Sequence, residues 1–116
     1  MKKFFALFLI PGSVMENWRK TTPPEAMKAQ SEEMMRAWGK WMKDHEKILV
    51  DRGGPLGKTK RVTAQNIADI KNDLGGYLIL EAESHEAAAK IFVGHPQFMI
   101  PEASIEVMEI PSMPGM

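Results

Sequence analysis

The chain has 116 residues, which is enough for one domain and too few for two ordinary ones. Fifteen Lys and Arg residues balance fifteen Asp and Glu residues, so no net charge draws the chain toward nucleic acid or an anionic membrane surface. The absence of cysteine excludes disulfides, thiolate nucleophiles and cysteine-based zinc sites, and it favours a cytoplasmic location.

The first predicted element is a strand over the apolar residues 3–10, which end at Pro11 and Gly12. The two lysines before this run make it resemble a secretion signal, but no small-residue cleavage site follows. Both alternating sets of its side chains are apolar, which is typical of a strand that is buried on both faces. We therefore expect one face to pack on the helices of this chain and the other face to pack on a second subunit.

Residues 13–21 are expected to be a connection, followed by a long amphipathic helix. Thr22, Pro23 and Glu25 match a capping box, which predicts a helix from about residue 23 to residue 51. The glycines at 53 and 54 and Pro55 are expected to end it. One face of this helix carries an apolar stripe that consists of Met34, Trp38, Trp41, His45 and Ile48.

The remaining elements are shorter. Residues 58–63 are predicted to form an edge strand, and the residues up to Leu74 a loop, although Ile67, Ile70 and Leu74 also fit a helical turn. Residues 77–82 predict a strand, Ser84 is expected to cap a second helix, and residues 104–110 alternate as the last strand. The tail, residues 111–116, is expected to be loose or to lie on a partner.

This order is βαββαβ, which predicts a single α+β domain over residues 1–116 with the ferredoxin-like fold. Its antiparallel sheet has two helices on one face, and the other face is bare in a monomer. An apolar face of this size is unusual on a soluble protein. We therefore expect a two-fold homodimer in which two sheets pack face to face as a dimeric α/β barrel.

Four stretches carry a resemblance to a known family: GGPLG at residues 53–57, GGYLILEAES at 75–84, HPQF at 95–98 and ASIEVMEI at 103–110. In their order and spacing they resemble the YCII-related domain family. The resemblance implies a ferredoxin-like fold and a dimeric α/β barrel. Some members of this largely uncharacterised family have been suggested to be enzymes that use a His–Asp pair beside the sheet. This chain has His95 where the family has the acid, and the position of the family's histidine falls near Ala37.

The candidate catalytic residues are His45, His95 and Tyr77, and the candidate ligand pocket consists of Trp38, Trp41, His45 and Glu81. His45 lies on the apolar stripe, where it is either a half-buried structural residue or an acid/base in a pocket. His95 follows the second helix, where it is either a cap or a pocket residue in the place of the family's acid. His85 is expected to be solvated. The spacing of the three histidines fits no metal-binding motif, so no metal and no cofactor are predicted.

The sequence predicts a homodimeric domain that binds a small molecule or a protein partner in a cleft between the long helix and the sheet. The alternative from another class is a small cofactor-independent enzyme of the dimeric barrel type with a histidine acid/base. A third possibility is a purely structural interaction module. Nucleic-acid and membrane partners are not expected.

Overall fold

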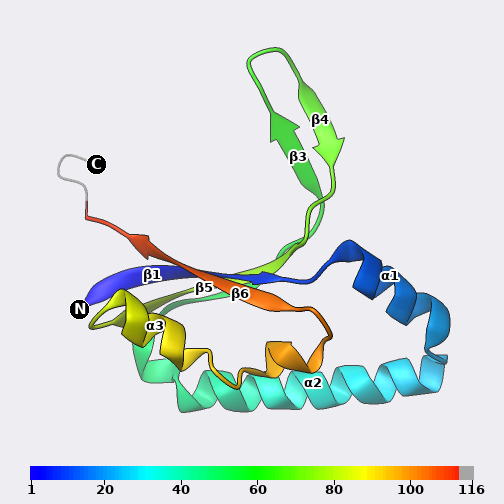
Figure 1. The fold of residues 1–116 in the computed structure, drawn as a ribbon, viewed down its shortest axis with the longest axis horizontal. Helices are drawn as coiled ribbons and strands as arrows, with labels where there is room; N and C mark the ends of the chain where they lie inside the picture. The colour runs from blue at the N-terminus through cyan, green and yellow to red at the C-terminus, as the bar shows by residue number, and fades with distance from the viewer. Residues whose placement is uncertain (113–116) are drawn as a thin grey trace.

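The computed structural model describes residues 1–112. Residues 113–116, which make up most of the predicted tail at 111–116, lie outside the described residues. The elements follow one another in the order shown in Figure 1. They are β1 (Lys2–Leu9), α1 (Gly12–Thr21), α2 (Pro24–Asp44), the 3-10 turn η1 (Glu46–Ile48), β2 (Leu49–Pro55), β3 (Thr59–Val62), β4 (Ile67–Ile70), β5 (Leu74–Ala82), α3 (His85–Ile91), the 3-10 turn η2 (Pro96–Met99) and β6 (Ser104–Ile110).

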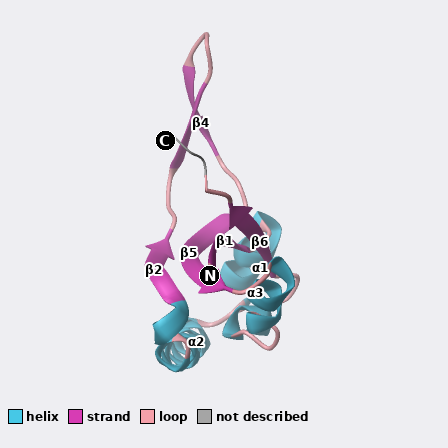
Figure 2. Ribbon diagram, turned by 90° about the vertical axis from the view of Figure 1, so that its left-hand side faces the viewer, coloured by secondary structure: helices cyan, strands magenta, loops and turns pink. Residues whose placement is uncertain are grey.

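Four strands form one sheet in the order β2-β5-β1-β6, and its paired neighbours are antiparallel. Helices α2 and α3 lie on one side of this sheet, as Figures 1 and 2 show. Counted without α1, β3 and β4, the chain is βαββαβ, and its third strand, β5, lies beside its first, β1. This arrangement confirms the predicted α+β, ferredoxin-like fold.

The core lies between the helices and the two central strands, β1 and β5. Alternate side chains of both strands are buried on the helix side. Phe8 packs edge-on against Trp38 of α2, with 4.7 Å between their ring centroids. The buried hydrophobic residues are Phe4, Ala6, Phe8, Trp41, Leu78, Leu80, Ala82, Ala88 and Phe92.

The opposite face of the sheet, which we call the open face, is also apolar. The side chains of Phe5, Leu7 and Leu9 of β1 lie on this face and are half-buried. In the register of the sheet, Phe5 lies between Ile79 and Met108. No helix of the described chain lies over this face, as Figures 1 and 2 show.

The prediction of a connection at residues 13–21 is wrong, because α1 occupies Gly12–Thr21. No residue of α1 is buried, and its apolar residues Val14, Met15 and Trp18 form only a short stripe, from which the helix was not predicted. Local pairs stabilise it instead, since Glu16 and Lys20 form an ion pair of 3.0 Å one turn apart. The capping box is also wrong, because Pro23 is the N-cap of α2 and no side chain caps it.

The long helix ends earlier than predicted, at Asp44 rather than residue 51. Residues from Leu49 onward form β2, which pairs with β5 at the edge of the sheet. The aliphatic residues Ile48, Leu49 and Val50 fit the end of a helical stripe and a strand equally well. Pairing with β5 decides in favour of the strand, because it satisfies backbone groups that a helix end leaves free.

Residues 59–62 form the predicted strand, β3, but it is not an edge of the main sheet. It pairs with β4, and the two strands form a separate hairpin that rises from the open side of the sheet. The predicted loop up to Leu74 therefore contains a strand, β4. We call this projecting hairpin, residues 56–73, the arm.

The last third of the chain follows the prediction closely. The hydroxyl of Ser84 accepts a hydrogen bond of 3.1 Å from the backbone N–H of Ala87 and caps α3. Strand β6 has the predicted limits, residues 104 and 110. His85 is exposed, as expected, and its Nε2 is also 2.7 Å from the carbonyl oxygen of Val107.

Candidate functional site

A cavity of about 510 Å³ lies between α2 and the sheet, and we call it the α2–sheet cavity. Helix α2 contributes Met35, Trp38 and Met42 to its wall, and β1 contributes Phe8. The other lining residues are Ile10, Arg52, Gly54, Pro55, Gly75, Gly76, Tyr77 and Gln97. This volume is within the usual range for sites that hold small organic molecules.

Two polar side chains stand at this mostly apolar cavity. Gln97 is buried, and its Nε2 donates a hydrogen bond of 3.3 Å to the carbonyl oxygen of Leu9. Arg52 is exposed, and its Nη2 lies 3.6 Å from Oε2 of Glu46, which is a loose ion pair. The cavity therefore combines an aromatic and thioether wall with one guanidinium group at its edge.

His95 lies next to this cavity, within a cluster of aromatic rings. Its ring centroid is 4.5 Å from those of Trp38 and Trp41, 5.1 Å from that of Phe8 and 5.9 Å from that of Phe92. Only 2% of the residue is exposed. Burial among these rings lowers the pKa of His95 from 6.5 to about 4, and His45 contributes in the same direction.

The neutral ring of His95 has a defined proton position. Its Nδ1 accepts a hydrogen bond of 2.8 Å from the backbone N–H of Gln97, which places the proton on Nε2. Nε2 is buried and has no hydrogen-bond partner among the described residues. His95 is thus the N-cap of η2, a short helix that was not predicted from the sequence.

His45 follows the last residue of α2 and caps that helix. Its ring stacks on Trp41 with 4.3 Å between centroids, and its Nδ1 is 2.7 Å from the carbonyl oxygen of Trp41. The structure therefore brings together four of the residues singled out from the sequence, as a row of contacting rings: Trp38, His95, Trp41 and His45.

Tyr77 and Glu81 are separated from that row. Their neighbours Leu78 and Leu80 are buried on the helix side, so the side chains of Tyr77 and Glu81 lie on the open face. The ring of Tyr77 is 5.7 Å from that of Phe5, and Tyr77 is also among the residues that line the α2–sheet cavity. Of the pocket predicted from the sequence, Trp38 alone is among the described residues that line the α2–sheet cavity.

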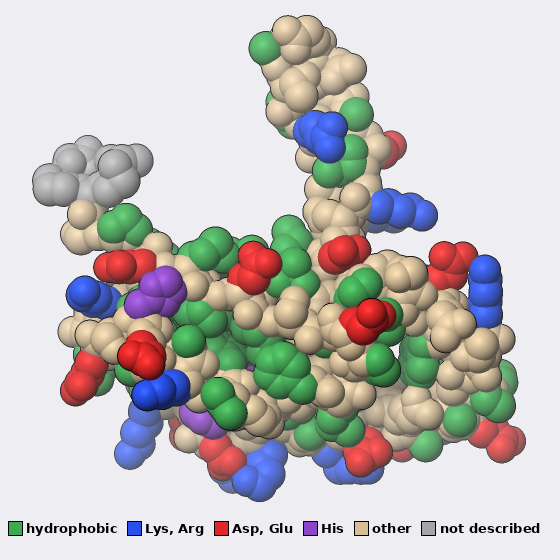
Figure 3. All heavy atoms as spheres, viewed as in Figure 1, with side chains coloured by type: hydrophobic (Ala, Val, Ile, Leu, Met, Phe, Trp, Pro, Cys, Tyr) green, Lys and Arg blue, Asp and Glu red, His purple; other side chains and the backbone are tan. Residues whose placement is uncertain are grey.

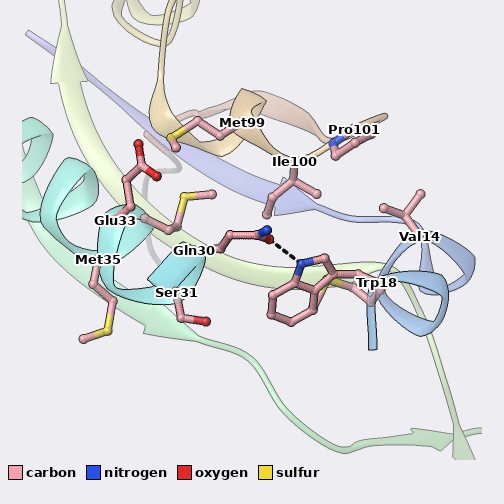
Figure 4. Close-up of a pocket in the computed structure, with 11 residues that line it drawn as sticks. Val14, Trp18, Gln30, Ser31, Glu33, Met35, Met99, Ile100 and Pro101 are labelled. Atoms are coloured by element: carbon pink, nitrogen blue, oxygen red, sulfur yellow. Dashed lines mark hydrogen bonds between the residues drawn. The ribbon is translucent and has the colours of Figure 1, made fainter. Parts of the chain in front are cut away.

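A second cavity, of about 470 Å³, lies between α1, α2 and the chain that follows η2. Figure 4 shows Val14 and Trp18 of α1 facing Ile100 and Pro101 across it. Nε1 of Trp18 donates a hydrogen bond of 2.7 Å to Oε1 of Gln30, which ties α1 to α2. Met35 contributes to the walls of both cavities.

Residues 1–112 contain neither a metal-binding cluster nor a helix that could span a membrane. No three His, Asp or Glu side chains in this part of the chain are arranged to hold a metal ion. No helix within it is both long and apolar enough to span a bilayer.

Comparison of the chain with known protein families finds no match, and comparison with curated proteins finds none. Among solved structures, it is similar to 5-chloro-2-hydroxyhydroquinone dehydrochlorinase from Burkholderia phenoliruptrix, determined in complex with 2,5-dihydroxybenzoquinone. The two are 17% identical, the match covers 91% of each chain, and the TM-score is 0.47. A likeness at this distance says nothing about function.

Sequence reasoning missed most of the cavity wall. Arg52 lies just beyond the predicted end of the long helix at residue 51, and Gln97 lies in the HPQF stretch, where the sequence assigns it no role. The wall becomes apparent only when β2 is placed beside β5, because this pairing sets Gly54 and Pro55 opposite α2.

Proposed function

We propose that this chain is a homodimeric domain that binds a small, flat organic anion in the α2–sheet cavity. The observation that carries the proposal is a cavity of about 510 Å³ with Phe8 and Trp38 in its wall and Arg52 at its edge. Aromatic walls favour a flat apolar ligand, and a guanidinium group favours a carboxylate or a similar anion. The order of motifs and strands also supports membership of the YCII-related family, and the cytoplasmic location stays a prediction.

The proposal favours this cavity over the one beside α1 because its walls are better fixed. Phe8 belongs to a central strand and is 3% exposed, and Gln97 is 2% exposed. The other cavity depends on α1, in which no residue is buried. A rigid wall loses less conformational entropy when a ligand binds.

A histidine acid/base has less support. The described residues that line the two cavities include no histidine, and His95, the buried histidine of the aromatic row, is held neutral by burial. The enzyme alternative therefore stays a prediction from the sequence, and binding is the function that the geometry supports best.

The test is a thermal-shift comparison of three probes that share one ring system: 2-naphthoate, 2-naphthalenemethanol and 2-naphthylmethylamine. Naphthoate should raise the melting temperature most and the amine least. At a concentration of about ten times Kd the stabilisation is about 1.4 kcal/mol, which corresponds to several degrees for a domain of this size.

Two variants locate the binding. Met42→Trp fills the α2–sheet cavity and should abolish the naphthoate shift, whereas Met15→Trp alters the cavity beside α1 and should leave it unchanged. Arg52→Gln should reduce the preference for naphthoate over the alcohol. A naphthoate shift that survives Met42→Trp, or no shift at millimolar naphthoate, would contradict the proposed site.

The homodimer rests on a separate observation, the open face. Phe5, Leu7 and Ile79 lie on this face, and it has no cover from a described helix. Figure 3 shows hydrophobic side chains along the upper edge of the body, beside the base of the arm. A second copy packed on the open face would remove these side chains from water.

A further inference from the structure

We infer that the arm is a clasp for the second copy of this chain: it reaches past the open face and packs along the body of the partner. This inference rests on the proposed homodimer and adds to it the part of the chain that holds the two copies together. Three observations carry it: the direction in which the arm points, the instability of the arm on its own, and its charge.

The first observation is the position of the arm. It leaves the sheet at Pro55 and returns at Leu74, the adjoining ends of β2 and β5. Figures 1 and 2 show it on the opposite side of the sheet from α2 and α3. This is the side of the open face, so a second sheet packed there lies beside the arm and within its reach.

The second observation is that the arm is ordered but has no core of its own. None of the residues from 55 to 73 is buried. Val62 and Ile67 face each other in the register near its tip and are 72% and 66% exposed. A two-stranded hairpin is at best marginally stable alone in water, and two large apolar side chains exposed at its tip require a surface to cover them.

The arm nevertheless has internal contacts that keep it straight. Lys60 and Asp69 form an ion pair of 2.6 Å across the two strands. At the turn, the hydroxyl of Thr63 accepts a hydrogen bond of 3.2 Å from the backbone N–H of Asn66. These contacts are typical of an element that is held ready to bind, not of a loose connection.

The third observation is charge complementarity between the arm and the open side of the body. The arm carries four basic residues, Lys58, Lys60, Arg61 and Lys71, against two acidic ones, Asp69 and Asp73. On the open face of the sheet, the register places Glu81 of β5 opposite Lys3 of β1, and Glu106 of β6 beside Leu7. A basic arm beside a face that carries carboxylates favours a second copy of this chain as the partner.

The absence of cysteine allows a direct test, because a single introduced thiol is the only one in the chain. Val62→Cys is labelled with benzophenone maleimide, irradiated and analysed for covalent dimers. Val93→Cys is the matched control, since Val93 is 80% exposed and lies after α3 on the helix side. We expect a cross-linked dimer from the label at position 62 and none from the label at position 93.

A second measurement gives the energetic contribution of the arm. The double variant Val62→Ser and Ile67→Ser should weaken dimerisation by on the order of tenfold or more in sedimentation equilibrium, because both copies lose apolar contacts. Far-UV circular dichroism checks that the variant remains folded.

The results of these experiments test the proposed role of the arm separately from the proposed homodimer. If the unmodified chain sediments as a monomer, the proposed homodimer is wrong and the clasp falls with it. If the chain is a dimer but the label at position 62 gives no cross-link and the double variant keeps its dissociation constant, the dimer stands and the clasp is wrong. A cross-link from the label at position 62 to nucleic acid, and not to a second copy of the chain, also overturns the inference.

Discussion

The titratable imidazole ring of His95 is buried in the core of this protein. Its Nδ1 caps η2 through the backbone N–H of Gln97, and the aromatic rings of Trp38 and Trp41 exclude water from the rest of the ring. The folded protein therefore contains His95 in its neutral form, and protonation of the His95 ring destabilises the fold. This gives the residue a measurable signature in solution.

Stability should fall as the pH drops from 6.5 to 4. In this window the unfolded chain binds a proton at His95 that the folded chain, with a pKa of about 4, does not bind. The stabilisation is complete above pH 6.5, and up to about 3 kcal/mol is lost by pH 4. Urea unfolding across this range measures the slope.

His95→Asn should flatten this slope, because asparagine can still accept the hydrogen bond from Gln97 but does not titrate. The variant has lost ring contacts and is expected to be less stable at every pH. The slope is the decisive quantity. The matched variant His85→Asn, at an exposed position, should keep the slope, and a slope shared by all three proteins would refute this account of His95.

At the scale of elements, the boundary between α2 and β2 shapes the candidate site. The chain leaves the helix at His45, passes through η1 and joins the sheet beside β5. The register of β2 is irregular between Asp51 and Gly54, where a bulge occurs. Gly53 has a φ of 63° in this bulge, and the Oδ1 of Asp51 accepts a hydrogen bond of 2.7 Å from its N–H.

Gly53→Ala should destabilise the protein by at least about 2 kcal/mol, since a Cβ there would collide with the carbonyl oxygen of Tyr77 in a left-handed conformation. Gly54→Ala is the neighbouring control, because a Cβ at Gly54 meets no atom within 4 Å. It should cost less than about 1 kcal/mol. Equal losses in urea unfolding would show that the bulge does not need glycine at position 53.

The element boundaries also show where sequence patterns succeed. The alternation in β6 and the Ser84 cap of α3 are local signals, and the structure has both at the predicted residues. Helix α1 has only a short apolar stripe and no buried residue, and the strand at residues 49–55 continues an apolar run that fits a helix as well. In such segments tertiary contacts override the local pattern.

At the scale of the whole molecule, the chain is too open to be explained as a compact monomer. Its radius of gyration is 16.4 Å, whereas a compact chain of this length is expected to have about 13 Å. The arm contributes to this excess, because it projects from the sheet without a cover. The proposed second copy on the open face would cover the exposed apolar side chains and would account for the extended shape.

The unmodified chain should therefore sediment at about twice 13.1 kDa at micromolar concentration, and its melting temperature should rise with protein concentration. Leu7→Glu should produce monomers, because a carboxylate in the centre of the open face would be buried without a partner. Val93→Glu, on the helix side, should leave the dimer intact. A dimer that tolerates Leu7→Glu would need a different interface.

The sequence by itself determined the core strands, their two apolar faces, the cap of α3 and the ferredoxin-like order, because these depend on the two-residue period of strands and on contacts between near neighbours. Only the tertiary structure decided that residues 49–55 form the edge strand and that residues 56–73 form an arm. It also decided that Trp38 and Arg52 meet at one cavity, whereas Glu81 lies on the open face of the sheet. These outcomes depend on which strand pairs with β5, and no local pattern encodes a contact between segments this far apart.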